Sequence, residues 1–354
     1  MKKMKKMSEK RDSLYDISWQ VDEATYRADK SLSYSTIARF HREGFDGLGK
    51  LFDKIESPSL LFGSLVDILI TGTQQEFDDN FIVAEFPDLP DSQINIVKTL
   101  FDRHSNSYTT LEDIPQDVLI SITTELEFQK GWKPETRAKV IKENGGQYYS
   151  LLHLCANKKL VSTKDYTDAQ ECVEALRTSE NTSDYFASPL PFEDDVEKFY
   201  QLKFKGDWNG ISIRCMLDKI DIDHKAKKIR PIDLKTSFKP EWDFFKSFIQ
   251  WGYWIQAQLY WYILRQNLDK HPLYKDYELL NYQFIVISNN TRKPLVWEYS
   301  DTKSIIDLAY GKNNDIVCKN WRGIVEELNY YLTKNPPYPL GIGQVNDITY
   351  WLNK

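Results

Sequence analysis

Apolar and polar residues alternate in three stretches of the middle of the chain, over residues 196–205, 210–222 and 228–235. An alternation of period two predicts strands, and the polar, lysine-rich segment between the last two predicts a hairpin turn. Apolar residues at helical spacing then predict a long helix over 241–267. Further strands are expected near 280–299 and a closing helix over 302–332. Strands flanked by helices predict a layered α/β or α+β fold built on a mixed central sheet.

The part of the chain before these strands carries helical patterns broken by turn signals. Residues 1–30 are polar, and we expect them to form a loosely ordered basic tail. Ser31 or Ser33 is a suitable N-cap for the helix that follows, because a short hydroxyl side chain can accept a hydrogen bond from the first turn. The predicted helices cover 34–45, 59–71 and several segments of 88–190. We therefore expect one domain over 31–354, with a helical elaboration inserted around 88–190.

The composition supports a chain with a substantial core. Of the 354 residues, 41% are hydrophobic, which suits one large domain or two modest ones. No apolar run approaches the ~20 residues that a membrane-spanning helix requires. The basic start has no apolar stretch after it, unlike a secretory signal, so we expect a cytoplasmic protein without membrane contact.

The cysteines and histidines do not form the patterns of common metal or redox sites. Cys155, Cys172, Cys215 and Cys318 are scattered without a C-x-x-C pair, which argues against a zinc ribbon, a disulfide framework or an iron–sulfur cluster. The five histidines include no H-E-x-x-H motif. A Walker-type glycine loop is also missing, so we expect no use of ATP.

Candidate chemistry lies in the predicted hairpin. Asp218 is near the end of its first strand, on the face opposite the apolar residues, and Asp233 and Lys235 share one face of the second strand. Leu234 is then expected to point into the core. A D-x-K triplet alone is most often a solvated strand edge. Two carboxylates and an ammonium on one surface of a hairpin are nevertheless a way to hold a divalent cation beside a lysine that positions water.

The helix after the hairpin adds a polar residue to an aromatic stripe. Tyr253, Gln256 and Tyr260 fall three and four residues apart, on one helical face. Such stripes are usually core. Packing does not explain a glutamine in the middle of one, because a buried amide needs hydrogen-bond partners. Gln256 is therefore a candidate to support the hairpin residues.

These residues resemble a known family. Asp218, Asp233-x-Lys235, and Gln256 with Tyr260 resemble the PD-(D/E)XK nuclease superfamily, in its RecB-like branch. The segments "LSYSTIARF", "LLFGSLVDILI", "LVSTKDYTDAQECVEALRTS" and "YQFIVISNNTRKPLVWEYS" are similar to parts of the RecE-type phage exonucleases, the exodeoxyribonuclease VIII-like proteins. The similarity spans 32–300 and implies a core like that of the restriction endonucleases.

Two positions depart from that family. Asp67 stands where the relatives have a histidine, and a carboxylate can also ligate Mg²⁺ or Mn²⁺. The alternative is an aspartate on the wet side of an amphipathic helix. On the strand before Gly210 relatives often carry a glutamate, whereas here the alignment falls on Gln201, with Glu197 nearby. Either of these two residues could join the site.

The resemblance implies a metal-dependent exonuclease that degrades linear duplex DNA from 5′ to 3′ in phage-type recombination, in a bacterial or phage-infected cell. Asp218 and Asp233 would bind Mg²⁺ or Mn²⁺, helped by the Leu234 carbonyl and Asp67. Lys235 would orient or deprotonate the attacking water. The remaining implied residues are Gln256 and Tyr260 as supports of the site, and Ser35, Arg39 and Tyr253 as DNA contacts.

The net charge of −6 does not by itself indicate a nucleic-acid binder. DNA contact needs only a local basic track, however, and the N-terminal lysines, Arg39 with Arg42, and "HKAKKIR" are candidates, although each could be an ordinary solvated face. Weak overall affinity would favour a homo-oligomeric ring or clamp around DNA, and a single-strand annealing protein is a candidate partner. An endonuclease on the same fold, or a DNA-binding relative without catalysis, remains as an alternative.

Overall fold

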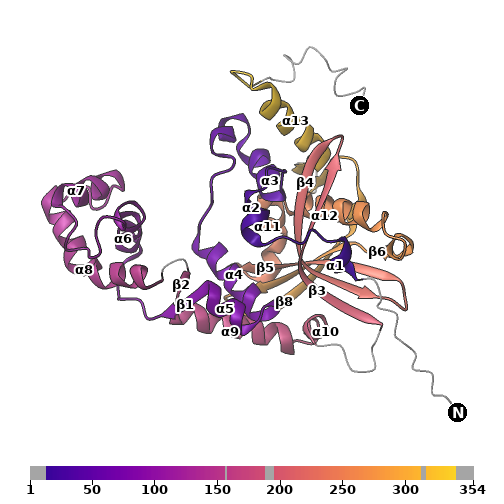
Figure 1. Cartoon of the computed structure of the whole chain (residues 1–354), viewed down its shortest axis with the longest axis horizontal. Helices are drawn as coiled ribbons and strands as arrows, with labels where there is room; N and C mark the ends of the chain where they lie inside the picture. Colours follow the sequence, from indigo (N-terminus) through magenta and orange to yellow (C-terminus); the bar gives the residue numbers. More distant parts are fainter. Residues whose placement is uncertain (1–12, 156–157, 188–194, 312–315, 340–354) are drawn as a thin grey trace. The chain divides into compact units, whose positions relative to one another are not determined.

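The computed structural model describes residues 13–155, 158–187, 195–311 and 316–339 (Figure 1). The chain forms two compact units, each described by itself below. One, the core unit, contains Met1–Ser57 and Ala175–Lys354, and the other, the helical unit, contains Pro58–Glu174. No helix in the described ranges combines the length and the apolar character needed to cross a membrane.

The core unit is built on a six-stranded mixed sheet with the order β3-β4-β5-β7-β8, in which β6 also pairs with β5. The β3–β4, β4–β5 and β7–β8 pairs are antiparallel, whereas β5 runs parallel to β6 and β7. The strands are β3 (Val196–Trp208), β4 (Ile211–Asp223), β5 (Lys228–Ser237), β6 (Glu278–Leu279), β7 (Tyr282–Ser288) and β8 (Pro294–Tyr299). The mixed α/β fold and the strands predicted from alternation are confirmed.

The predicted helix over 241–267 is wrong in one respect, because it is broken in the middle. A short 3-10 turn, η2 (Glu241–Asp243), leads into α11 (Phe244–Trp251), and α12 (Tyr253–Leu268) follows. Gly252 between them has φ +70°, a left-handed conformation that glycine adopts without the steric cost of a Cβ. The chain therefore changes direction just before the predicted Tyr253–Gln256–Tyr260 face.

Helix α12 packs across the sheet and carries much of the core. Ile255, Leu259 and Ile263 are fully buried on it. Gly206 of β3 permits a close approach, since a Cβ there would come within 2.7 Å of the Ile263 side chain. Helices α3 (Tyr34–Glu43) and α13 (Trp321–Lys334) pack beside α12 and against each other. Figure 1 shows α12 and α13 beside β3 and β4.

The closing helix predicted over 302–332 is wrong for its first half. The structure has a short turn, η4 (Ser300–Lys303), then the antiparallel strands β9 (Leu308–Tyr310) and β10 (Ile316–Cys318), and only then α13. Asn320 caps α13, because its side chain accepts a hydrogen bond from the Arg322 backbone at 3.2 Å. Residues 312–315 lie outside the described ranges.

Part of the segment expected to be a loose tail folds onto the core unit. Residues 1–12 lie outside the described ranges, but α1 (Leu14–Ile17) and α2 (Glu23–Ala28) are formed, and Leu14 and Tyr26 are buried. The Trp19 backbone donates to the Lys203 carbonyl at 2.7 Å, along the outer edge of β3. This cover protects an edge strand that would otherwise present unpaired backbone groups.

The segment that follows extends the sheet before it enters α3. Leu32 forms an isolated parallel bridge with Ile213 of β4. Ser33 is the N-cap of α3, as its hydroxyl accepts a hydrogen bond from the Thr36 backbone at 3.4 Å. Of the two predicted caps, Ser33 is therefore the one used.

The helical unit has its own hydrophobic core between α6, α7 and α8, which includes Ile96, Leu119 and Tyr149. Figure 1 shows these three helices grouped together. The short parallel pair β1–β2, which the sequence pattern did not predict, belongs to this unit. Its elements are α4 (Pro58–Thr71), α5 (Gln74–Asn80), β1 (Phe81–Ala84), α6 (Asp91–His104), α7 (Gln116–Glu125), α8 (Pro134–Cys155), β2 (Lys159–Ser162) and most of α9 (Thr163–Thr178).

Candidate functional site

The β4–β5 hairpin is closed at its turn and opens at Asp218. Its ladder runs from the pair Asp223–Lys228 to the pair Lys219–Ile232 and stops there. From Ile232 onward β5 pairs instead with β7, on its other side. The Leu234 N–H donates to Asp218 Oδ2 at 3.0 Å, so a side chain replaces the β4 backbone as its partner.

A second irregularity in the sheet faces the same point. Gln201 of β3 has φ +53° and lies between the pairs Tyr200–Lys219 and Leu202–Leu217, so it is opposite Asp218. On both strands the residues that face the core are odd-numbered on one side of this irregularity and even-numbered on the other. Phe199 gives way to Leu202 and Phe204 on β3, and Cys215 and Leu217 give way to Ile220 and Ile222 on β4, all in one hydrophobic cluster.

This irregularity at Gln201 distinguishes between Gln201 and Glu197, the two β3 residues that the sequence offered as members of the site. Gln201 lies across from Asp218, whereas Glu197 is paired with Ile222, four residues along β4. Glu197 Oε2 also lies 3.0 Å from His224 Nε2. Gln201 is therefore the β3 residue placed at the opening of the hairpin. The skipped position in "CMLDKIDI" was the sequence signal for this irregularity.

Asp233 is the most enclosed carboxylate of the site, with 1% of its surface exposed. Gln256 Nε2 on α12 donates a hydrogen bond to its Oδ1, and Lys235 Nζ forms an ion pair with its Oδ2. Asp233 and Lys235 share a face as strand alternation requires. The expectation that Leu234 points into the core is wrong, because Asp233 faces α12 and Leu234 is only half-buried.

Lys235 remains a cation despite its surroundings. Burial alone would lower the pKa of this ammonium, but Asp233, then Tyr253 and Asp218, outweigh that effect and raise the pKa above its ordinary value. Lys235 Nζ also lies 4.9 Å from the centre of the Tyr253 ring, within reach of a cation–π interaction. With 19% of the side chain exposed, the charge is accessible from one side.

Aromatic rings enclose this cluster. The Tyr34 ring of α3 lies 6.4 Å from that of Tyr253 and 6.3 Å from that of Tyr260, between centroids. Burial raises the pKa of Tyr260 and Tyr34 well above the ordinary value, and the nearby Asp233 acts in the same direction. Both phenols therefore stay protonated, and the wall around the carboxylates is neutral and of low polarity.

The oxygen atoms at the opening suit a hard cation. Among the described residues no group of three or more His, Cys, Asp or Glu side chains is arranged to hold a metal. Asp218 and Asp233 supply two carboxylates. The Leu234 carbonyl points to the same side of β5 as its N–H, towards Asp218, where the ladder has ended. In addition, Gln256 Oε1 is buried and accepts no hydrogen bond from the described residues. A set of oxygen donors of this kind fits Mg²⁺ or Mn²⁺.

Asp67 lies on α4 of the helical unit and is half-buried. Its backbone carbonyl accepts a hydrogen bond from Thr71 Oγ1 at 2.8 Å, within the helix. It belongs to a different unit from the hairpin residues, and its role as a ligand stays a prediction.

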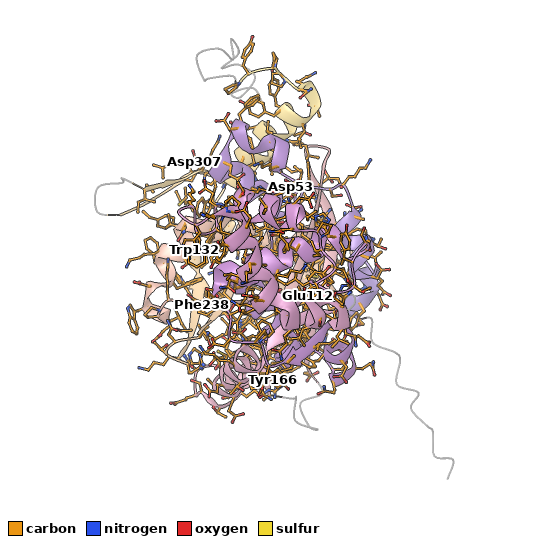
Figure 2. The ribbon with its side chains drawn as sticks, turned by 90° about the vertical axis from the view of Figure 1, so that its left-hand side faces the viewer. Asp53, Glu112, Trp132, Tyr166, Phe238 and Asp307 are labelled. Atoms are coloured by element: carbon orange, nitrogen blue, oxygen red, sulfur yellow. The ribbon has the colours of Figure 1, made fainter. Side chains whose placement is uncertain are left out.

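The predicted DNA contacts differ in how far they are already occupied. Ser35 is exposed at the start of α3, with its Oγ 2.9 Å from that of Ser33. Arg39 is only 12% exposed, forms an ion pair with Glu43 at 3.1 Å, and donates to the carbonyl of Asp53, which is labelled in Figure 2. Tyr253 packs under Lys235. Arg39 is thus held by its own unit.

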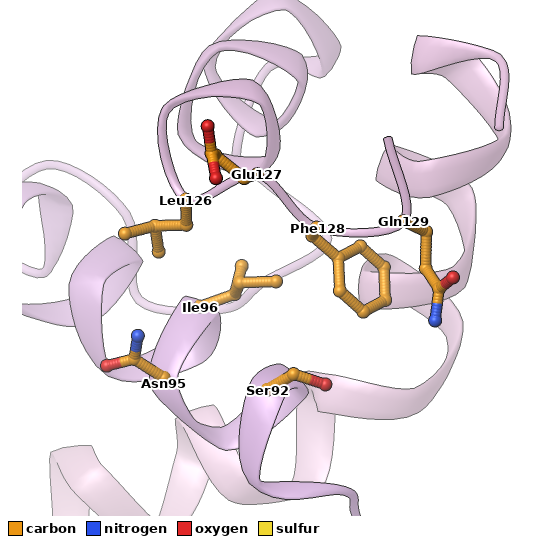
Figure 3. Close-up of a pocket in the computed structure, with 7 residues that line it drawn as sticks. All are labelled: Ser92, Asn95, Ile96, Leu126, Glu127, Phe128 and Gln129. Atoms are coloured by element: carbon orange, nitrogen blue, oxygen red, sulfur yellow. The ribbon is translucent and has the colours of Figure 1, made fainter. Parts of the chain in front are cut away.

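Two hollows lie away from the candidate site. One, of about 260 Å³, is in the helical unit and is lined by Ser92, Asn95, Ile96 and Leu126–Gln129 (Figure 3). The other, of about 340 Å³, lies between the 15–22 segment and β3 and reaches Gln201. Neither is lined by Asp218, Asp233 or Lys235.

The solved structures that are similar to this chain share little of its sequence. No family model matches it, and no curated protein does. A solved structure described as "Putative exonuclease" from Eubacterium rectale is similar, with a TM-score of 0.39 and 16% identity over 80% of this chain and 79% of that one. A structure of SSO0001 has a TM-score of 0.23 and 11% identity over 80% of this chain and 90% of that one. The function therefore has to be argued from the residues of the site.

Proposed function

We propose that the core unit is a metal-dependent deoxyribonuclease, and more specifically an exonuclease acting on linear duplex DNA, from 5′ to 3′. The observation that carries the proposal is the open end of the β4–β5 hairpin. There the carboxylates of Asp218 and Asp233 and the ammonium of Lys235 come together beside backbone that no longer pairs with β4. Phosphodiester hydrolysis needs such a combination of anionic ligands and a nearby cation.

Asp218, Asp233 and the Leu234 carbonyl would hold Mg²⁺ or Mn²⁺. The ion, when bound, supplies charge stabilisation at the scissile phosphate and lowers the pKa of water. Each protein ligand is fixed in advance: Asp218 by the Leu234 N–H, and Asp233 by Gln256. Such preorganisation lowers the reorganisation required when the phosphate arrives. Asp67 would complete the set from the helical unit.

Lys235 would act on the substrate side of the cluster. Its raised pKa supports a role as a permanent cation, which orients the attacking water and neutralises charge that develops on the phosphate. Tyr260 and Gln256 would keep Asp233 in place from α12. The enclosed aromatic wall would limit bulk water around the carboxylates, which strengthens these charge interactions.

The wider setting follows from the same proposal. We propose a role in phage-type recombination, in the cytoplasm of a bacterium or an infected cell, with duplex DNA ends as substrate and a single-strand annealing protein as partner. A homo-oligomeric ring or clamp would hold DNA despite the negative net charge. No ATP, zinc or iron–sulfur cluster is proposed.

One assay tests the activity. The protein is incubated with Mg²⁺ and with linear, nicked, circular and single-stranded DNA, each linear molecule labelled at one terminus. We expect linear duplex to shorten from its 5′ ends while circular duplex stays intact. Cleavage of circular duplex would replace the exonuclease with an endonuclease. Binding without cleavage of any substrate would contradict the proposed activity.

A further inference from the structure

An exposed tryptophan stands at the break between α11 and α12. Trp251 is the last residue of α11, and 43% of its surface is exposed although the side chain is large and aromatic. The left-handed Gly252 follows directly, and α12 starts at Tyr253. The turn therefore places an exposed aromatic residue two positions from the ring that packs under Lys235.

Contacts through Tyr34 connect Trp251 to the candidate site. The Tyr34 hydroxyl donates to the Trp251 carbonyl at 2.9 Å. The ring of the same tyrosine packs against Tyr253, whose own ring lies 4.9 Å from Lys235 Nζ. All of these residues belong to the core unit, so Trp251 is held at the border of the proposed reaction centre.

Two cations, Arg42 and Lys239, lie near the end of α11. The guanidinium of Arg42 lies 5.3 Å from the centre of the Trp251 ring, and its Nη1 donates to the Trp251 carbonyl at 3.4 Å. Lys239 Nζ donates to Gln250 Oε1, one residue before Trp251, at 3.3 Å. Within the described ranges no carboxylate forms an ion pair with either side chain. Arg39, one turn earlier on α3, is paired with Glu43.

We propose that Trp251, Arg42 and Lys239 form a nucleotide subsite that takes an unpaired base, next to the reacting phosphate, of the DNA strand being cut. An exposed indole offers a face for stacking, and stacking needs no particular base. Arg42 and Lys239 meet the phosphates on either side of that base. A base within a duplex has both faces covered, so the subsite selects a frayed or single-stranded end. This inference rests on the proposed nuclease function.

The test couples the base to the tryptophan. The full chain carrying Lys235→Ala, which prevents turnover, is titrated with a labelled duplex that ends in a short single-stranded extension, with Kd measured by anisotropy. A second duplex has abasic nucleotides in that extension. We expect Trp251→Ala and the abasic extension each to weaken binding about 5- to 100-fold, the usual range for loss of one base–aromatic stack. In combination they should cost little more than either alone.

Matched variants separate stacking from general disturbance. Trp251→Phe keeps an aromatic face and should retain most of the affinity. Trp242→Ala removes a tryptophan that is 68% exposed on η2 and should leave binding unchanged. Arg42→Ala should lower the slope of log Kd against log salt by about one unit, and Arg42→Lys should restore it.

The outcomes distinguish this inference from the function on which it rests. An abasic penalty that is the same with and without Trp251, or an equal loss in Trp242→Ala, overturns the subsite while the nuclease proposal stands. No binding of either duplex by the wild-type chain, measured without divalent cations so that no cleavage occurs, overturns both.

Discussion

The two ends of the β4–β5 hairpin carry similar residues in different surroundings. At the closed end Lys228 forms an ion pair with Glu278 at 3.8 Å, and Asp223 accepts a hydrogen bond from the Ala226 backbone at 2.8 Å, inside the turn. At the open end Asp218 accepts from the Leu234 backbone, and Asp233 is held by α12 and Lys235. Both ends thus pair acids with a lysine.

The difference lies in the backbone. Where the ladder runs, the peptide groups of the two strands satisfy each other, and the acids only stabilise the hairpin locally. Where it stops, side-chain and main-chain oxygens point into the same gap, as cation binding requires. A carboxylate is therefore a candidate metal ligand where the pairing of the strands stops beside it, and not where the pairing continues.

The largest effect is expected from the open-end acids. Asp218→Ala and Asp233→Ala should each reduce Mg²⁺-dependent cleavage of linear DNA by roughly 10³-fold or more, because charge stabilisation at the phosphate is lost. Asp223→Ala, in the closed end, should cleave at the wild-type rate. If Asp218→Ala also cleaves near the wild-type rate, the open end is not the site.

The same two variants should differ in stability. Asp233→Ala leaves the Lys235 ammonium without its ion-pair partner and the Gln256 donor without its acceptor, at a cost of about 2 kcal/mol, whereas Asp218→Ala should unfold at nearly the same urea concentration as the wild type.

The second largest effect is expected at Lys235. Lys235→Ala should keep DNA binding but lose turnover by roughly 10²–10⁴, the scale of a positioned proton-transfer or charge-stabilising group. Lys228→Met, at the closed end, is the matched control and should keep the wild-type rate. Single-turnover kinetics at saturating DNA separates the effect of Lys235 on the chemical step from its effect on DNA binding. A Lys235→Ala protein that no longer binds DNA would assign the lysine to substrate binding.

A smaller effect is expected from the support on α12. Gln256→Leu keeps a similar volume but removes the donor to Asp233, so cleavage should fall about 10- to 100-fold. Part of this loss should be recovered at high Mg²⁺ concentration, because a ligand that is less well oriented weakens binding rather than chemistry. An unchanged Mg²⁺ dependence would show that Gln256 serves the fold alone.

The smallest effect is expected at Asp67. If Asp67 is a metal ligand, the Asp67→His protein should keep measurable activity and shift its preference towards Mn²⁺. Asp67→Ala and Asp67→Asn should both lose activity, and the alanine variant should recover part of it at high metal concentration. If Asp67 is an ordinary helix residue, all three variants should cleave DNA at similar, near-normal rates.

The strands and most helices could be predicted because their signals are local. Alternation identified β3, β4 and β5, and Ser33 identified the start of α3. The break at Gly252 and the strands β9 and β10 were missed, since apolar spacing alone did not distinguish them from continuous helix. Glycine within "QWGYW" was the available signal for the break.

The candidate site was predictable only as a set of residues. The positions of Asp218, Asp233, Lys235 and Gln256 were named from the sequence, and the contacts among them are present in the structure. The end of the β4–β5 ladder was not predictable, because the alternation in β5 continues past Ile232, where its pairing with β4 stops and only its pairing with β7 goes on. The different contacts of Arg42, with Trp251, and of Arg39, with Glu43, depend in the same way on the folded structure.

The most direct test of the central claim is metal binding itself. Mn²⁺ affinity is measured by calorimetry for the wild type, for Asp218→Ala at the open end and for Asp223→Ala at the closed end. We expect the wild type and Asp223→Ala to bind Mn²⁺ with similar affinity, and Asp218→Ala to bind it at least about tenfold more weakly, because one ligand is lost. Equal affinities for the three proteins, or a greater loss in Asp223→Ala, would contradict the claim.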